Sequence, residues 1–143
     1  MGLTARERDH FDRLGYVVKP GVYSATDLAP LREDLARLID AHAARLGAGR
    51  YHGPPILAMI RHEPLLACIR DLVGDTIIGG AVYRIRPKAP AAPRGAVPWH
   101  RDSGYLLAHC DRYLIVTCWI PLVDANVENG CLYVIPGVHR QGI

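Results

Sequence analysis

The sequence predicts an α+β protein in which helices come first and strands follow. Residues 1–75 carry apolar side chains at the three- and four-residue spacing of amphipathic helices. Residues 76–143 instead contain three runs rich in apolar and β-branched residues, separated by turn-forming residues. Strands that follow a block of helices in this way favour an antiparallel sheet. The length of 143 residues predicts a single domain.

The first helix has recognisable signals at both ends. Thr4 and Glu7 stand three residues apart, which is the spacing of a capping box at a helix N-terminus. The helix is expected to run to Leu14, because Gly15 is the residue type that ends helices in a left-handed conformation.

Two further helices are expected before residue 76. One begins at Ser24 or Thr26, either of which suits an N-cap, and ends by Gly47. The other follows Pro64 and stops at Gly74. Each presents one apolar face, so we expect both helices to pack against a common core.

Strands are predicted where the apolar residues no longer recur every three or four positions but form continuous or alternating runs. A short strand is expected at 16–19, and longer ones at 76–86, 113–120 and 131–135. The last of these follows a turn at 128–130, whose Asn-Gly pair is typical of tight hairpins. The sequence therefore supplies a sheet of four or five strands.

Composition argues against a nucleic-acid or membrane partner. The net charge is +3, and the 15 arginines and 2 lysines are scattered rather than gathered in a basic stripe. No run of about 18 apolar residues is present, and the first residues lack the apolar core of a signal peptide. We therefore expect a cytoplasmic protein that binds neither nucleic acid nor a membrane.

The cysteines support the same compartment. Their positions, Cys68, Cys110, Cys118 and Cys131, contain no Cys-x-x-Cys pair. This spacing is unlike a zinc ribbon or a disulfide framework, so we predict buried free thiols in a reducing cytoplasm.

The segment around His100 holds the candidate metal ligands. In a strand, residues i and i+2 point to the same face, so His100 and Asp102 would direct an imidazole and a carboxylate to one point. Two histidines and one carboxylate form the facial triad of non-haem Fe(II) oxygenases. The alternative is a hydrogen-bonded pair at a strand end. A second His-x-Asp, His10 and Asp12, lies on a predicted helix, where i and i+2 diverge.

The motifs around these residues resemble a known family. The stretches VPWHRDSGYL (97–106) and YLIVTCWIPLVDANVENGCLYVIPGVHRQG (113–142) are similar to the phytanoyl-CoA dioxygenase (PhyH) family of Fe(II)/2-oxoglutarate oxygenases. The stretch FDRLGYVVKPG (11–21) looks like the opening motif of the same family. Similar sequence thus covers most of the chain.

The resemblance implies a fold and a site. The fold would be N-terminal helices packed on an incomplete double-stranded β-helix, a cupin-like jelly roll. His100 and Asp102 would be the first two Fe(II) ligands, with 2-oxoglutarate as cosubstrate. Trp119 would border the 2-oxoglutarate site, although packing in the core is an alternative role for it.

The resemblance also implies residues that this sequence does not contain. In the family, a second His ligand and an Arg that binds the distal carboxylate of 2-oxoglutarate lie beyond the PGxHR motif, whereas the sequence stops at Ile143. We expect the N-terminal part of such an enzyme, inactive alone and prone to self-association through exposed strands. His139 belongs to the PGxHR loop and His109 to a loop that faces solvent, so neither is the favoured third ligand.

Two alternatives remain open at the sequence level. One is a catalytically inactive fragment or pseudoenzyme that serves as a binding or assembly piece. The other is a cupin-type protein that holds another divalent metal and recruits His139 or His109.

Overall fold

A computed structural model describes residues 2–42, 53–80, 85–86, 97–105, 107–110 and 112–141. It contains four α-helices: α1 (Ala5–Leu14), α2 (Ala25–His42), α3 (Pro54–Ile60) and α4 (Glu63–Val73). Three short 3-10 helices follow in the second half of the chain: η1 (Asp102–Tyr105), η2 (Ala108–Cys110) and η3 (Val138–Arg140).

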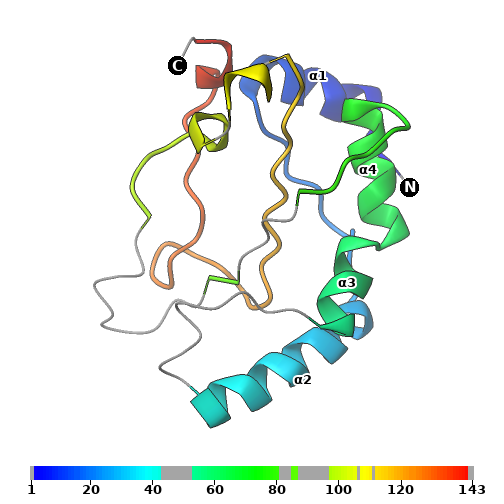
Figure 1. Cartoon of the computed structure of the whole chain (residues 1–143), viewed down its shortest axis with the longest axis vertical. Coiled ribbons are helices and arrows are strands. Elements are labelled where there is room, and N and C mark those ends of the chain that lie inside the picture. The colour runs from blue at the N-terminus through cyan, green and yellow to red at the C-terminus, as the bar shows by residue number, and fades with distance from the viewer. Residues whose placement is uncertain are drawn as a thin grey trace.

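The α-helices follow one another around one side of the molecule (Figure 1). Helix α1 lies across one end, α4 and α3 continue from it, and α2 crosses the opposite end. The second half of the chain passes along the inner side of this arc as extended segments and short turns. The C-terminal turn η3 lies beside the C-terminal end of α1, far along the sequence from it.

Helix α1 begins and ends at the predicted residues. The Thr4 hydroxyl accepts a hydrogen bond from the Glu7 amide at 3.2 Å, and the Glu7 carboxylate accepts from the Thr4 amide at 2.7 Å. This capping box satisfies backbone donors that the first helical turn leaves free. Gly15 ends the helix with φ of 80°, a conformation that a side chain would disfavour.

Helix α2 uses the first of its two predicted caps. The Ser24 hydroxyl accepts from the Asp27 amide at 3.1 Å, and the Asp27 carboxylate accepts from the Ser24 amide at 2.8 Å. Pro30 lies inside the helix, so the regular part begins before this proline. The predicted stop at Gly47 lies outside the described residues.

Of the two remaining helices, α4 was predicted from the sequence and α3 was not. Helix α4 spans the predicted region and ends at Gly74, whose φ is 86°. Helix α3 was not predicted, because its seven residues are too few to display a helical period. Its signal is local: Pro54 and Pro55 occupy the first helical positions, where a missing backbone N–H costs nothing.

The core is formed where α2 packs on α3. Leu31, Leu35 and Ile56 form one buried cluster, and Leu31 and Ile56 are each only 2% exposed. Met59, Ile60, Ile85 and Leu122 pack around it. The predicted apolar face of the second helix is therefore the face that is buried.

Replacing Leu31 with alanine should lower the free energy of unfolding by roughly 2–5 kcal/mol, because it removes buried apolar volume and leaves a cavity. Leu57 provides the control, since it lies on α3 yet is 51% exposed. Leu57→Ala should cost well under about 1 kcal/mol. Urea unfolding of both variants is the measurement, and equal losses would contradict this account of the core.

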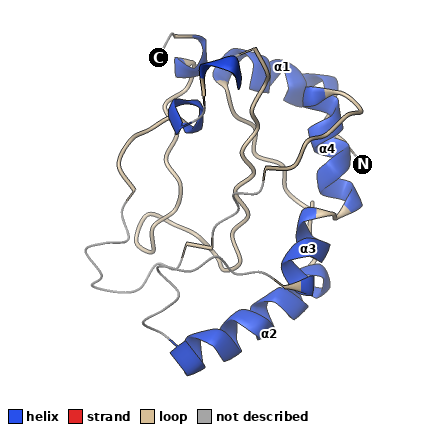
Figure 2. Cartoon of the chain, in the orientation of Figure 1, coloured by secondary structure: helices blue, strands red, loops and turns tan. Residues whose placement is uncertain are grey.

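The predicted sheet and the incomplete jelly roll are wrong. No strand occurs in the described part of the chain, where the second half consists of loops and 3-10 helices (Figure 2). A strand requires a ladder of hydrogen bonds to a neighbouring backbone, not only an extended conformation. The segments at 113–120 and 131–135 are without such a ladder among the described residues. The prediction at 81–84 lies outside those residues.

The predicted turn at 128–130 is present, although it joins no hairpin. The Asn126 side chain accepts from the amides of Glu128 and Asn129, both at 3.0 Å. Gly130 has φ of 88°, and the Cys131 amide donates to the Asn126 carbonyl at 2.9 Å. Side-chain hydrogen bonds of asparagine to its own backbone form such turns without help from flanking strands.

All four cysteines are free, as predicted, but the expectation that they are buried is correct only for Cys68: Cys110 and Cys131 are partly exposed and Cys118 is exposed. Cys68 is buried in α4, and this burial raises the pKa of its thiol. None of the helices in the described ranges is long and apolar enough to cross a membrane.

Candidate functional site

His100 and Asp102 lie close together, but not on a strand. His100 precedes η1, and Asp102 is the first residue of that 3-10 helix. The distance from His100 Nε2 to Asp102 Oδ1 is 3.4 Å. The expected convergence of imidazole and carboxylate is therefore present, whereas the expected reason for it, a shared strand face, is wrong. A tight turn brings the two side chains together instead.

A backbone carbonyl orients the His100 ring. His100 Nδ1 lies 2.7 Å from the Pro98 carbonyl oxygen. A carbonyl oxygen only accepts, so Nδ1 carries the proton and donates it in this hydrogen bond. In the tautomer that carries its proton on Nδ1, the lone pair is on Nε2, the nitrogen that faces Asp102. A hydrogen bond of this kind, from the far ring nitrogen to a carbonyl, is usual in metal-binding histidines.

The paired atoms are suited to share a cation. An unprotonated Nε2 and a carboxylate oxygen both present lone pairs, so a proton or a metal ion between them removes their repulsion. Two donors each about 2.1 Å from one ion and roughly 90–110° apart are separated by about 3.0–3.4 Å. Their observed separation matches that range. The two side chains are 35% and 45% exposed, so an ion has access from solvent.

Thr117 completes the surroundings of Asp102. Its hydroxyl donates a hydrogen bond to Asp102 Oδ2, the oxygen that does not face His100. The sequence analysis did not identify this residue, because the contact joins positions 15 residues apart and no local pattern marks it.

Trp119 lies two residues further along the same extended segment and is 44% exposed. This exposure contradicts the alternative that it packs in the core.

His139 contacts a helix end rather than the candidate site. Its Nε2 lies 3.0 Å from the Asp12 carbonyl oxygen, and Arg140 donates to the same oxygen from Nε at 3.1 Å and Nη2 at 2.6 Å. The Gly137 amide donates to the Leu14 carbonyl at 2.9 Å. The PGxHR motif thus satisfies carbonyls that the last turn of α1 leaves free, and the cationic side chain of Arg140 suits the negative end of the helix.

The same C-terminal turn also reaches the candidate site. The Arg101 guanidinium donates to the backbone carbonyl of Gln141, directly after η3. Arg101 stands between His100 and Asp102 in sequence, so the turn is connected both to α1 and to the candidate ligands. These contacts span 40 residues or more, and the sequence carries no signal for them.

The described part of the chain brings no third ligand to His100 and Asp102. His109 lies in η2 and is exposed, in agreement with the prediction of a solvent-facing residue. Within the described ranges, no group of three His, Cys, Asp or Glu side chains is arranged to hold a metal ion. Those ranges therefore contain two convergent donors, His100 and Asp102.

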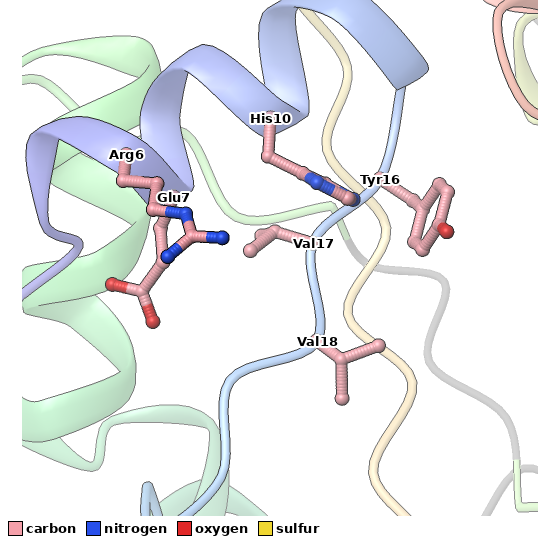
Figure 3. Close-up of a pocket in the computed structure, with 6 residues that line it drawn as sticks. All are labelled: Arg6, Glu7, His10, Tyr16, Val17 and Val18. Atoms are coloured by element: carbon pink, nitrogen blue, oxygen red, sulfur yellow. The ribbon is translucent and has the colours of Figure 1, made fainter.

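The second His-x-Asp pair behaves as predicted for a helix. His10 packs edge-on against Tyr16, with ring centroids 5.1 Å apart, and it lines a pocket of about 280 Å³ (Figure 3). The pocket lies between α1 and residues 16–18, and Asp12 is not among its lining residues. Asp12 is occupied through its carbonyl by the C-terminal turn. His10 and Asp12 therefore do not converge.

The acidic residue of this pocket has a structural role. Glu7 accepts the amide of Thr4 and the ammonium of Lys19, and these hydrogen bonds lower its pKa to about 2. The ion pair joins α1 to the extended segment that follows it, with Nζ and Oε2 2.9 Å apart. Glu7 is thus engaged by neighbours rather than directed toward a ligand.

Comparisons with known proteins point to one family. The family model Phytanoyl-CoA dioxygenase (PhyH) matches residues 11–143. Phytanoyl-CoA dioxygenase domain-containing protein 1 of Mus musculus is 30% identical over 101 residues, covering 69% of this chain and 33% of the mouse protein. Ectoine dioxygenase of Stutzerimonas stutzeri is 25% identical over 150 residues, covering 93% of this chain and 49% of that enzyme. The corresponding enzyme of Halomonas elongata is 26% identical over 159 residues, covering 96% and 46%.

The chain spans about a third to a half of the length of these curated relatives. No solved structure was found to match it.

Proposed function

Because the chain belongs to the phytanoyl-CoA dioxygenase (PhyH) family, we propose that it carries two iron ligands of an Fe(II)/2-oxoglutarate-dependent dioxygenase that hydroxylates a small molecule. The ligands are His100 Nε2 and an Asp102 carboxylate oxygen. The observation that carries the proposal is the 3.4 Å approach of Nε2 to Oδ1 within the motif that resembles the family.

The donor set suits the metal. An imidazole nitrogen and a carboxylate oxygen are two of the three protein ligands in the facial triad of non-haem Fe(II) oxygenases. Pro98 supports this role, since its carbonyl accepts a hydrogen bond from Nδ1 and so orients the ring with Nε2 toward Asp102. Bound Fe(II) would supply the site at which 2-oxoglutarate and O₂ react.

Trp119 is proposed to border the 2-oxoglutarate site. It is two residues from Thr117, whose hydroxyl contacts Asp102, and its side chain is exposed enough to contact a ligand. An indole there would exclude water from one side of the bound cosubstrate while leaving the metal-facing side open.

An anaerobic Fe(II) titration with and without 2-oxoglutarate tests the proposal. If 2-oxoglutarate chelates iron held by His100 and Asp102, it should tighten Fe(II) binding, and the effect should disappear in Asp102→Asn. Metal binding that is indifferent to 2-oxoglutarate would instead favour a site for another divalent metal. A chain that binds no metal would favour a binding or assembly role.

We expect no succinate at an enzymatic rate from the 143-residue chain alone. The described residues bring two protein donors together, and two donors hold iron weakly. A facial triad has a third donor, and an Arg would be needed on the distal carboxylate of 2-oxoglutarate. Succinate release with Fe(II), ascorbate and 2-oxoglutarate is the measurement. Sustained formation that depends on His100 would show that another residue of this chain completes the site.

A further inference from the structure

We propose that Thr117 is a positioning residue that fixes which oxygen of Asp102 is presented to the metal. This inference rests on the proposed function, since it concerns the same pair of ligands. It assigns a role to a side chain that neither the motif spacing nor the resemblance identified.

The two oxygens of the Asp102 carboxylate have different neighbours. Oδ2 accepts the hydrogen bond from the Thr117 hydroxyl, whereas Oδ1 lies 3.4 Å from His100 Nε2. The final torsion of an aspartate is broad, so an unrestrained carboxylate exchanges its oxygens or turns away. The hydroxyl restrains this rotation, and Oδ1 alone remains directed toward the imidazole.

Thr117 also connects two separate segments. Asp102 lies in η1, while Thr117 lies in the extended segment that follows Tyr113. Their hydrogen bond therefore joins two described segments that are not paired as strands. Thr117 is exposed, so burial of its methyl group does not account for the contact. The functional group of Thr117 is therefore its hydroxyl.

A hydroxyl donor on one carboxylate oxygen favours binding of the metal through the other oxygen alone. His100 is held in an equivalent way by the Pro98 carbonyl. Each ligand thus has one atom engaged by the protein and one atom directed toward the shared point. Partners of this kind typically contribute 10- to 100-fold in metal affinity.

The test is a Co(II) titration of the full 143-residue chain, monitored by the visible absorption of the bound ion. Thr117→Val keeps the branched shape and removes the hydroxyl, so affinity should fall roughly tenfold. The absorption band should also change shape, because a released carboxylate binds through a different set of oxygens. Thr117→Ser keeps the hydroxyl and should restore both affinity and band shape.

Ser24→Ala is the matched control. Ser24 also donates its hydroxyl to a carboxylate, that of Asp27 at 2.6 Å, but at the start of α2. Its loss should reduce helix stability and leave Co(II) affinity unchanged. Circular dichroism of each variant, with Thr117→Ala as a second hydroxyl deletion, separates loss of the site from loss of folding.

The outcomes separate this proposal from the proposed function. Thr117→Val binding as tightly as the wild type, or Thr117→Ser failing as Thr117→Val does, would overturn the positioning role while leaving the ligands in place. Co(II) affinity of the wild type that does not depend on His100 or Asp102 would overturn the proposed site itself, and the role of Thr117 with it.

Discussion

Replacing His100 with alanine is expected to abolish specific Fe(II) binding by this chain. His100 supplies one of two convergent donors, and its ring is already held with Nε2 directed toward Asp102. Removing a donor outright should exceed the roughly 10- to 100-fold loss that follows removal of a residue that merely supports a ligand. Isothermal titration with Fe(II) under anaerobic conditions measures the change.

The chain contains its own control for this experiment. His10 belongs to the same His-x-Asp tripeptide, yet it lies in α1 with its ring against Tyr16. His10→Ala should therefore leave Fe(II) affinity unchanged, although it removes the same chemical group. Equal affinity of the wild type and the His100→Ala protein would contradict the site, as would an equal loss in the two variants.

Local signals account for the helices that sequence predicted correctly. Helix α1 is bounded by a capping box and a glycine, and all of these residues lie within or directly beside the helix. Helix α4 ends at Gly74 for the same kind of reason. Helical hydrogen bonds join residues four apart, so the information that forms a helix is close by in sequence.

Local signals of this kind cannot decide whether an apolar run pairs into a sheet. The run at 113–120 has the composition of a buried strand, but composition determines only that a backbone favours an extended form. Pairing depends on a second segment that may lie far away in sequence, and among the described residues the extended runs have no ladder. Apolar content therefore predicted strands that the described residues do not form.

In the candidate site, too, the contact between residues close in sequence was predicted and the contacts between distant residues were not. His100 and Asp102 are two residues apart, so a strand and a tight turn both bring them together, and the motif identified the pair although the assumed geometry was wrong. Thr117 and Gln141 reach this region from 15 and 40 residues away. Contacts over such distances depend on the path of the whole chain, which no short motif specifies.

We also expect the isolated chain to self-associate, because its second half exposes large apolar side chains. Within the two extended runs the exposed fraction is 55% for Leu114, 56% for Leu132, 60% for Tyr113 and 58% for Tyr133. Contiguous exposed apolar surface is a recognised cause of association, as is an extended backbone without a partner. Covering a few hundred Å² on association would contribute on the order of 5–10 kcal/mol at about 25 cal/mol per Å².

Sedimentation velocity over a range of concentrations is the measurement, and the sedimentation coefficient should rise with concentration. Replacing Leu114 and Leu132 together with lysine should shift the distribution toward a single chain, because burying these charges in a contact would be costly. Leu57→Lys is the control, since Leu57 is 51% exposed but lies on α3, away from the extended runs. A wild-type chain that sediments as a monomer at every concentration would show that these side chains are tolerated in water, and association through the extended runs would then be wrong.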